Sequence, residues 1–149
     1  MKFDNLRKYF PLVFMFAILS IMWGCGSDGG TVANESTSKS ASLSVISSGS
    51  SEYIIQGNNM DGVAGIYLTI SYDSAVMTAP AVTEGGVDSG SLIMANTNVP
   101  GTIKIAIING KSFSGSGPIA KISFATQSGA SGISISSASM SDIKGAPVP

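Results

Sequence analysis

Hydrophobic and polar residues alternate along residues 65–72, GIYLTISY. Successive side chains of an extended strand point to opposite sides of the sheet, so this stretch predicts a strand with one apolar face and one mixed face. The apolar face, which we assign to the core, has Ile66, Leu68, Ile70 and Tyr72. The other face has Tyr67, Thr69 and Ser71.

The same alternation recurs in residues 102–108, TIKIAII, and in residues 119–126, IAKISFAT. In the first, the predicted inward residues are Ile103, Ile105 and Ile107, and the outward ones are Thr102, Lys104 and Ala106. In the second, the predicted inward residues are Ala120, Ile122 and Phe124, and the outward ones are Lys121 and Ser123. Each sheet is therefore expected to have one dry face and one wet face.

Short apolar runs separated by turn residues continue along the chain, and no stretch has a helical period. The predicted strands are Ser42–Ile46, Tyr53–Gly57, Ala64–Tyr72, Val76–Val82, Ser91–Asn96, Thr102–Ile108, Ile119–Thr126, Ile133–Ser136 and a ninth at Ala138–Asp142. Many short strands at near-regular spacing predict an all-β domain, either a two-sheet antiparallel sandwich or a barrel.

The first 24 residues have a different pattern. Lys2, Arg7 and Lys8 precede an apolar run from about Tyr9 to Trp23, which is the layout of a secretory signal. The run is about 15 residues long, short of the roughly 20 that a helix needs to span a bilayer. We therefore expect export followed by removal of residues 1–24.

The single cysteine, Cys25, follows this run directly. Its placement resembles a bacterial lipoprotein signal, in which the cysteine is acylated and becomes the first residue; the alternative is a free thiol in an exported protein. Gly26 follows it, where aspartate would retain an enteric lipoprotein at the inner membrane. The resemblance implies a lipid anchor at the outer membrane or the cell surface.

Residues 25–41 are rich in Gly, Ser and Thr and have few large apolar side chains, so they predict a flexible tether. Residues 42–149 would form one domain. With Cys25 acylated, this domain could form no disulfide, and a chain of roughly 110 residues is long enough to rely on its hydrophobic core.

Charge and composition exclude several functions. Eight Lys and Arg residues against nine Asp and Glu residues give no reason to expect nucleic acid as a partner. The absence of histidine removes Ser-His-Asp catalysis and the usual zinc sites. The carboxylates lie mostly in predicted turns without the dense spacing of a calcium loop, among them Asp61, Asp73, Glu84 and Asp88. We expect no enzyme activity, no metal and no cofactor.

Taken together, four segments resemble a cohesin domain: MDGVAGIYLTISYDSAVM, VPGTIKIAII, GSGPIAKISF and SGISISSASMSDIKGAPV. They occur in the order of that family and cover roughly Ser42 to Val148. The resemblance implies a jelly-roll sandwich of about nine strands in two antiparallel sheets.

In dockerin-binding cohesins the partner lies on the outer face of one sheet, whose central strands are similar to Ala64–Tyr72 and Thr102–Ile108. The resemblance therefore implies a partner face with Tyr67, Thr69, Ser71, Thr102 and Lys104. Another extracytoplasmic protein, such as a dockerin-like module, would be the partner. The family is similar in fold to some carbohydrate-binding modules, which suggests polysaccharide binding as an alternative. A structural surface protein without a specific ligand is a third interpretation.

Overall fold

The computed structural model describes residues 40–87 and 90–149. The predicted signal at residues 1–24, the predicted lipid attachment at Cys25 and most of the predicted tether lie outside the described residues, so these remain predictions. Within the described residues, no helix is long and apolar enough to cross a membrane.

The described residues form eight strands. They are β1 (Ser42–Ser47), β2 (Glu52–Asn58), β3 (Gly65–Tyr72), β4 (Met77–Glu84), β5 (Leu92–Val99), β6 (Thr102–Ile108), β7 (Gly117–Gln127) and β8 (Ile133–Ser141).

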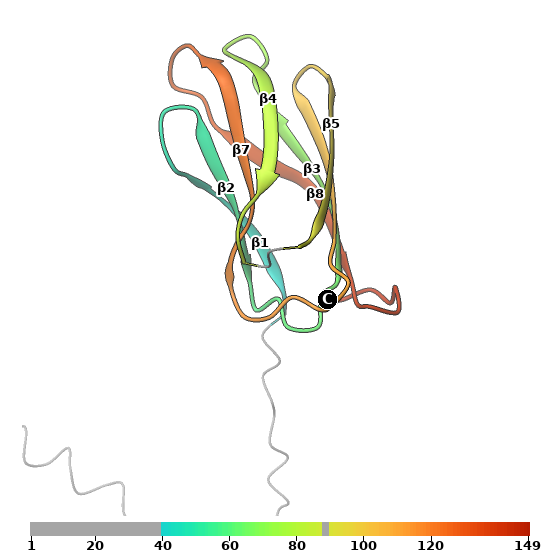
Figure 1. Ribbon diagram of the computed structural model, residues 1–149. Helices are drawn as coiled ribbons and strands as arrows, with labels where there is room; N and C mark the ends of the chain where they lie inside the picture. Colours follow the sequence, from blue (N-terminus) through green and yellow to red (C-terminus); the bar gives the residue numbers. More distant parts are fainter. Residues whose placement is uncertain (1–39, 88–89) are drawn as a thin grey trace, which may run out of the picture. The chain divides into compact units, whose positions relative to one another are not determined.

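These strands form two antiparallel sheets, which pack as the two layers of a sandwich (Figure 1). The first, sheet A, has the order β1-β2-β7-β4, and the second, sheet B, has the order β5-β6-β3-β8. Hairpins join β1 to β2 and β5 to β6, while the remaining connections cross from one sheet to the other. This arrangement confirms the predicted all-β jelly-roll sandwich.

The core lies between the two sheets and is formed by the residues that the alternation predicted to be inward. Ile66, Leu68 and Ile70 of β3 are buried, and Tyr72 packs against the core at its edge. The remaining predicted inward residues are also buried: Ile103, Ile105, Ile107, Ala120, Ile122 and Phe124. Because full burial of one isoleucine stabilises a fold by about 1.5–3 kcal/mol, the registers of β3 and β6 are strongly fixed.

The expected ninth strand is not separate. Residues of the predicted strands at Ile133–Ser136 and Ala138–Asp142 belong to the single strand β8, whose pairing with β3 shifts by one residue. Thr69 pairs with Ser137 and Ile70 with Ile135, so Ser136 is an extra residue in β8, a β-bulge. The bulge breaks the alternation of inward residues, which is why the sequence pattern suggested two strands.

One end of the sandwich, here called the base, holds the start of β3, the end of β6 and the end of β8. The chain enters here, because the first residue of β1 pairs with the last residue of β2, from which residues 59–64 lead to β3. The chain also ends here, where Val148 N–H donates to the carbonyl of Met140 (3.0 Å). The C-terminus is marked at this lower end in Figure 1.

Candidate functional site

The outer face of sheet B, which points away from the core, is a grid of side chains set by the strand registers. At the base, the first row runs across β5, β6, β3 and β8 as Leu92, Ile108, Gly65 and Ser141. The second row has Met94, Ala106, Tyr67 and Ser139. The third row has Asn96, Lys104, Thr69 and Ser137, and a fourth has Val99, Thr102, Ser71 and Ser134.

The two rows nearest the base are apolar on β5, β6 and β3, and their polar members are Ser141 and Ser139 of β8. Four large side chains keep about half of their surface accessible: Tyr67 (49 %), Ile108 (51 %), Met94 (53 %) and Leu92 (58 %). Single exposed hydrophobic residues are common on soluble proteins, but a contiguous group on one sheet face is typical of an interaction site.

The two rows farther from the base are mostly polar. Their side chains are hydroxyls, one amide, the charged Lys104 and, on the edge strand β5, the exposed Val99. Lys104 lies between Asn96 of β5 and Thr69 of β3, both neutral, and it makes no ion pair within residues 40–87 and 90–149. Its ammonium group therefore has no opposite charge among its neighbours on the sheet.

A hollow of about 390 Å³ lies at the base of this face, where Gly65 has no side chain. Ile108 and Tyr67 flank it, and Pro147 of the C-terminal segment closes one side. A Cβ atom at Gly65 would stand 2.6 Å from Oγ of Ser141, so a side chain here would fill the hollow and displace that hydroxyl.

All five residues predicted to face a partner lie together on this face. β3 contributes Tyr67, Thr69 and Ser71, and β6 contributes Thr102 and Lys104. Thr69 pairs directly with Lys104, and Ser71 pairs with Thr102. Their role in binding stays a prediction.

Sequence reasoning missed the apolar part of the face, namely Leu92, Met94 and Ile108. The signal was present in two places. In LIMAN, Leu92 and Met94 alternate with Ile93, which packs against the core, and in the pair Ile107–Ile108 only one side chain can point inward.

The described carboxylates near turns have local roles. Asp73 accepts a hydrogen bond from Ala75 N–H, and Asp61 accepts one from Gly115 N–H. Asp142 accepts from both Lys144 N–H and Ala146 N–H. No three acidic, cysteine or histidine side chains in the described ranges lie close enough to hold a metal ion.

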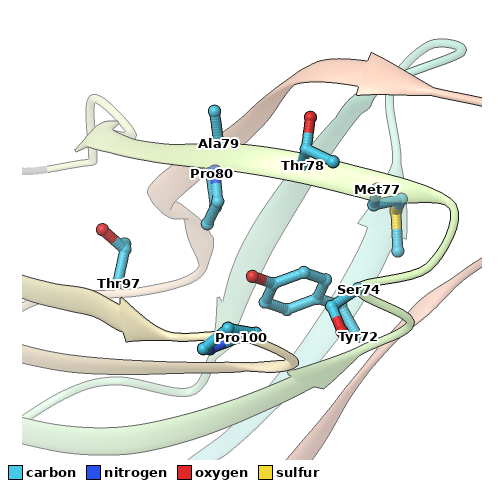
Figure 2. A pocket seen from close by; sticks show the side chains of 8 residues that line it. All are labelled: Tyr72, Ser74, Met77, Thr78, Ala79, Pro80, Thr97 and Pro100. Atoms are coloured by element: carbon cyan, nitrogen blue, oxygen red, sulfur yellow. The ribbon is translucent and has the colours of Figure 1, made fainter.

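A second hollow, of about 480 Å³, lies at the opposite end of the sandwich, between β4 and the turn that joins β5 to β6 (Figure 2). Pro80 lies on the β4 side and Pro100 on the turn side, with the Tyr72 ring between them. Next to it, Ala79 has a positive φ of 48° and is left out of the pairing with β7. This hollow opens between the two sheets and is separate from the outer face of sheet B.

The aromatic side chains bear on the polysaccharide alternative, since sugar rings usually stack on exposed aromatic rings. Tyr53, Phe113 and Phe124 are buried, and Tyr72 packs against Phe124 with ring centroids 5.0 Å apart. Among the described residues, Tyr67 is the aromatic side chain with the most exposed ring. It lies among aliphatic and hydroxyl side chains rather than in a row of aromatic rings.

Comparison with known families gives a match over most of the chain: the model of the cohesin domain matches residues 32–146. No curated protein sequence matches significantly.

Solved structures with a similar fold are cohesin modules. A non-cellulosomal cohesin from the archaeon Archaeoglobus fulgidus superposes with a TM-score of 0.63 and 21 % identity, over 74 % of this chain and 83 % of that chain. A scaffoldin B cohesin of Acetivibrio cellulolyticus, in complex with a mutant Cel5 dockerin, gives 0.60 and 19 %, over 73 % and 91 %. The OlpA cohesin of Clostridium thermocellum, in complex with a dockerin, gives 0.62 and 12 %, over 74 % and 92 %.

Proposed function

Because the chain belongs to the cohesin-domain family, we propose that it is a non-catalytic recognition module that binds another extracytoplasmic protein through the outer face of sheet B. Cohesins are binding modules, typically extracellular or at the cell surface. Two of the structures that it resembles hold a cohesin in complex with a dockerin. A dockerin-like module is therefore the first partner class to test.

One observation carries this proposal: four large apolar side chains, about half exposed, lie side by side at one end of a regular sheet face. Aromatic and Met side chains are enriched at protein interfaces, and the binding energy concentrates in a few such anchors. Here Tyr67 and Met94 lie in the same row, separated by the small side chain of Ala106.

The N-terminal segment supports a surface location. We propose that Cys25 carries lipid, that residues 1–24 are removed, and that residues 25–41 tether the domain to the outer membrane or cell surface. Stable anchoring needs two membrane signals, and a doubly acylated cysteine would provide them. A Gly/Ser-rich tether of this length would extend on average by roughly 20–25 Å.

The partner proposal is tested by capture. The full chain, immobilised in mild detergent, is incubated with exported proteins of the same cells, and the retained proteins are identified by mass spectrometry. A partner of this face should be lost when Tyr67→Ala or Met94→Ala is used. It should be retained with Lys121→Ala, which changes an exposed side chain on sheet A.

Two results would contradict this proposal. An identical set of captured proteins on Tyr67→Ala and on the unchanged chain would mean that this face is exposed to solvent and binds no partner. Capture of soluble glycans on an array, without capture of any protein, would favour polysaccharide binding instead.

The anchor is tested by mass spectrometry of the N-terminus of the native protein. We expect a chain that starts at Cys25 and carries acyl groups. An unmodified Cys25 thiol, or a mature N-terminus elsewhere, would contradict the lipoprotein proposal without affecting the proposed binding face.

A further inference from the structure

Resting on the binding face proposed above, we infer the chemistry of the partner: it inserts an apolar side chain at Gly65 and places a carboxylate on Lys104. The two features lie on neighbouring strands of the same face. They are far enough apart to be contacted by separate residues of one partner element.

The hollow at Gly65 fits an apolar anchor. Ile108, Tyr67 and Ala106 provide apolar walls, and the hollow of about 390 Å³ opens to solvent on the outer face. An inserted aliphatic or aromatic side chain would remove apolar surface from water on both partners, which is the main favourable term in association. A charged side chain would lose its hydration there without a counter-charge, because the lining residues are neutral.

The positive charge of Lys104 favours a partner with a negative charge at the contact. Among the described residues, no Asp or Glu lies on the outer face of sheet B. The neighbours of Lys104 across the sheet, Asn96 and Thr69, are neutral. A partner that covers this ammonium group needs a carboxylate opposite it, because an unpaired charge buried at an interface is costly.

The same charge pattern argues against a second copy of this chain as the occupant. Two such faces in contact would bring together two Lys104 side chains with no carboxylate from either face. A heterologous acidic protein is the better match.

The strand register gives the spacing between the two contacts. Gly65 and Thr69 are four residues apart on β3, and Lys104 pairs with Thr69. At roughly 3.3 Å per residue, the backbone of Gly65 and the backbone of Lys104 are about 13 Å apart along the strand direction. In a partner helix aligned with β3 this corresponds to about nine residues at 1.5 Å per residue.

The test uses a yeast-displayed library of random 20-residue peptides as the probe and the purified full chain in mild detergent as the target. Enriched peptides should contain Asp or Glu together with a large apolar residue. Lys104→Glu should weaken them ten-fold or more, and exchange of the peptide carboxylate for Lys should restore binding to that variant. Gly65→Val, which fills the hollow, should also weaken them ten-fold or more, while Lys121→Glu on sheet A should not.

Thermal unfolding of each variant controls for misfolding, and the surface change Lys104→Glu keeps the test usable if Gly65→Val fails to fold. Peptides that depend on Tyr67 but are indifferent to Lys104→Glu would overturn the acidic partner and leave the binding face standing. A library in which no enriched peptide responds to any change on this face would overturn both.

Discussion

The side chains of β6 alternate between the core and the outer face of sheet B, so adjacent residues differ in burial. Ile105 is fully buried between the sheets. It pairs with Leu68 of β3 on one side and with Ala95 of β5 on the other. Lys104, one residue earlier, points to solvent on the outer face. Adjacent substitutions should therefore separate stability from binding.

Ile105→Ala should lower the free energy of unfolding by about 2–5 kcal/mol, because it removes buried methyl groups and leaves a cavity. Lys104→Ala should change it by about 0.5 kcal/mol or less, as exposed substitutions usually do. Denaturant titration of both variants measures the difference. Equal losses of stability would mean that the assigned faces of β6 are wrong.

Gly85 is a position where the backbone of a neighbouring strand leaves no room for a side chain. It follows β4 and donates its N–H to the carbonyl of Ile119 (3.0 Å), and an added Cβ would lie 2.5–2.6 Å from the backbone of residues 118–120. Since backbone cannot move aside as a flexible side chain can, Gly85→Ala should destabilise the fold by about 1–3 kcal/mol.

The matched control is Gly110→Ala, where an added Cβ meets no atom within 4 Å. It should be neutral or stabilising by up to about 1 kcal/mol, because alanine restricts the unfolded chain. Thermal unfolding of the two variants side by side checks the prediction, and a neutral Gly85→Ala would contradict the close contact.

At the residue scale, alternation predicted the inward side chains of β3, β6 and β7, because a period of two is visible in the sequence alone. The hollow at Gly65 was not predictable in this way. It depends on which residues of neighbouring strands stand opposite, and the pairing of Gly65 with Ile108 and Ser141 is a property of the assembled sheet.

Among the elements, β8 is the strand whose pattern is least regular. Ile133 and Ile135 pack against the core, and so does Met140, although Met140 lies seven and five positions after them, an odd step that would put it on the other face of a regular strand. The extra residue Ser136 absorbs this change of phase, and its Oγ donates to the carbonyl of Thr69 (3.0 Å). The bulge was therefore hidden from any interpretation that assumed strict alternation.

Deletion of Ser136 should be tolerated, with a loss of about 1 kcal/mol from its hydrogen bond, because it restores regular alternation between Ile135 and Met140. Deletion of Ser134 should cost about 2 kcal/mol or more, because Ile133 and Ile135 would become adjacent and one of them would point to solvent. Unfolding curves of the two deletions test this. The opposite ranking would contradict the placement of the bulge.

For the whole molecule, the core between two four-stranded sheets is the stabilising feature that the described residues show. The order of the strands in each sheet could not be derived from local patterns, since it depends on which strands meet after the chain has crossed between layers. The resemblance to cohesins implied only that β3 and β6 are the central strands of one sheet, which the order β5-β6-β3-β8 confirms.

We predict that the full chain unfolds at nearly the same temperature with and without a chelator. A metal bound to the native state alone would stabilise it in proportion to the logarithm of its concentration. The carboxylates of Asp61, Asp73 and Asp142 instead hold backbone N–H groups of turns. A melting temperature that drops by more than about 4 °C in chelator, which is roughly 1 kcal/mol for a domain of this size, would reveal a bound ion.

The common position of both domain ends at the base has a consequence for chain order. β1 and β8 contact each other across the sandwich. A short flexible linker could therefore join Pro149 to the start of β1 at Ser42 at a small entropic cost. New ends could then be opened in the turn at residues 128–132, at the opposite pole. Such a circular permutant would keep every strand pairing and would carry its new ends at the pole farthest from the two rows of side chains nearest the base.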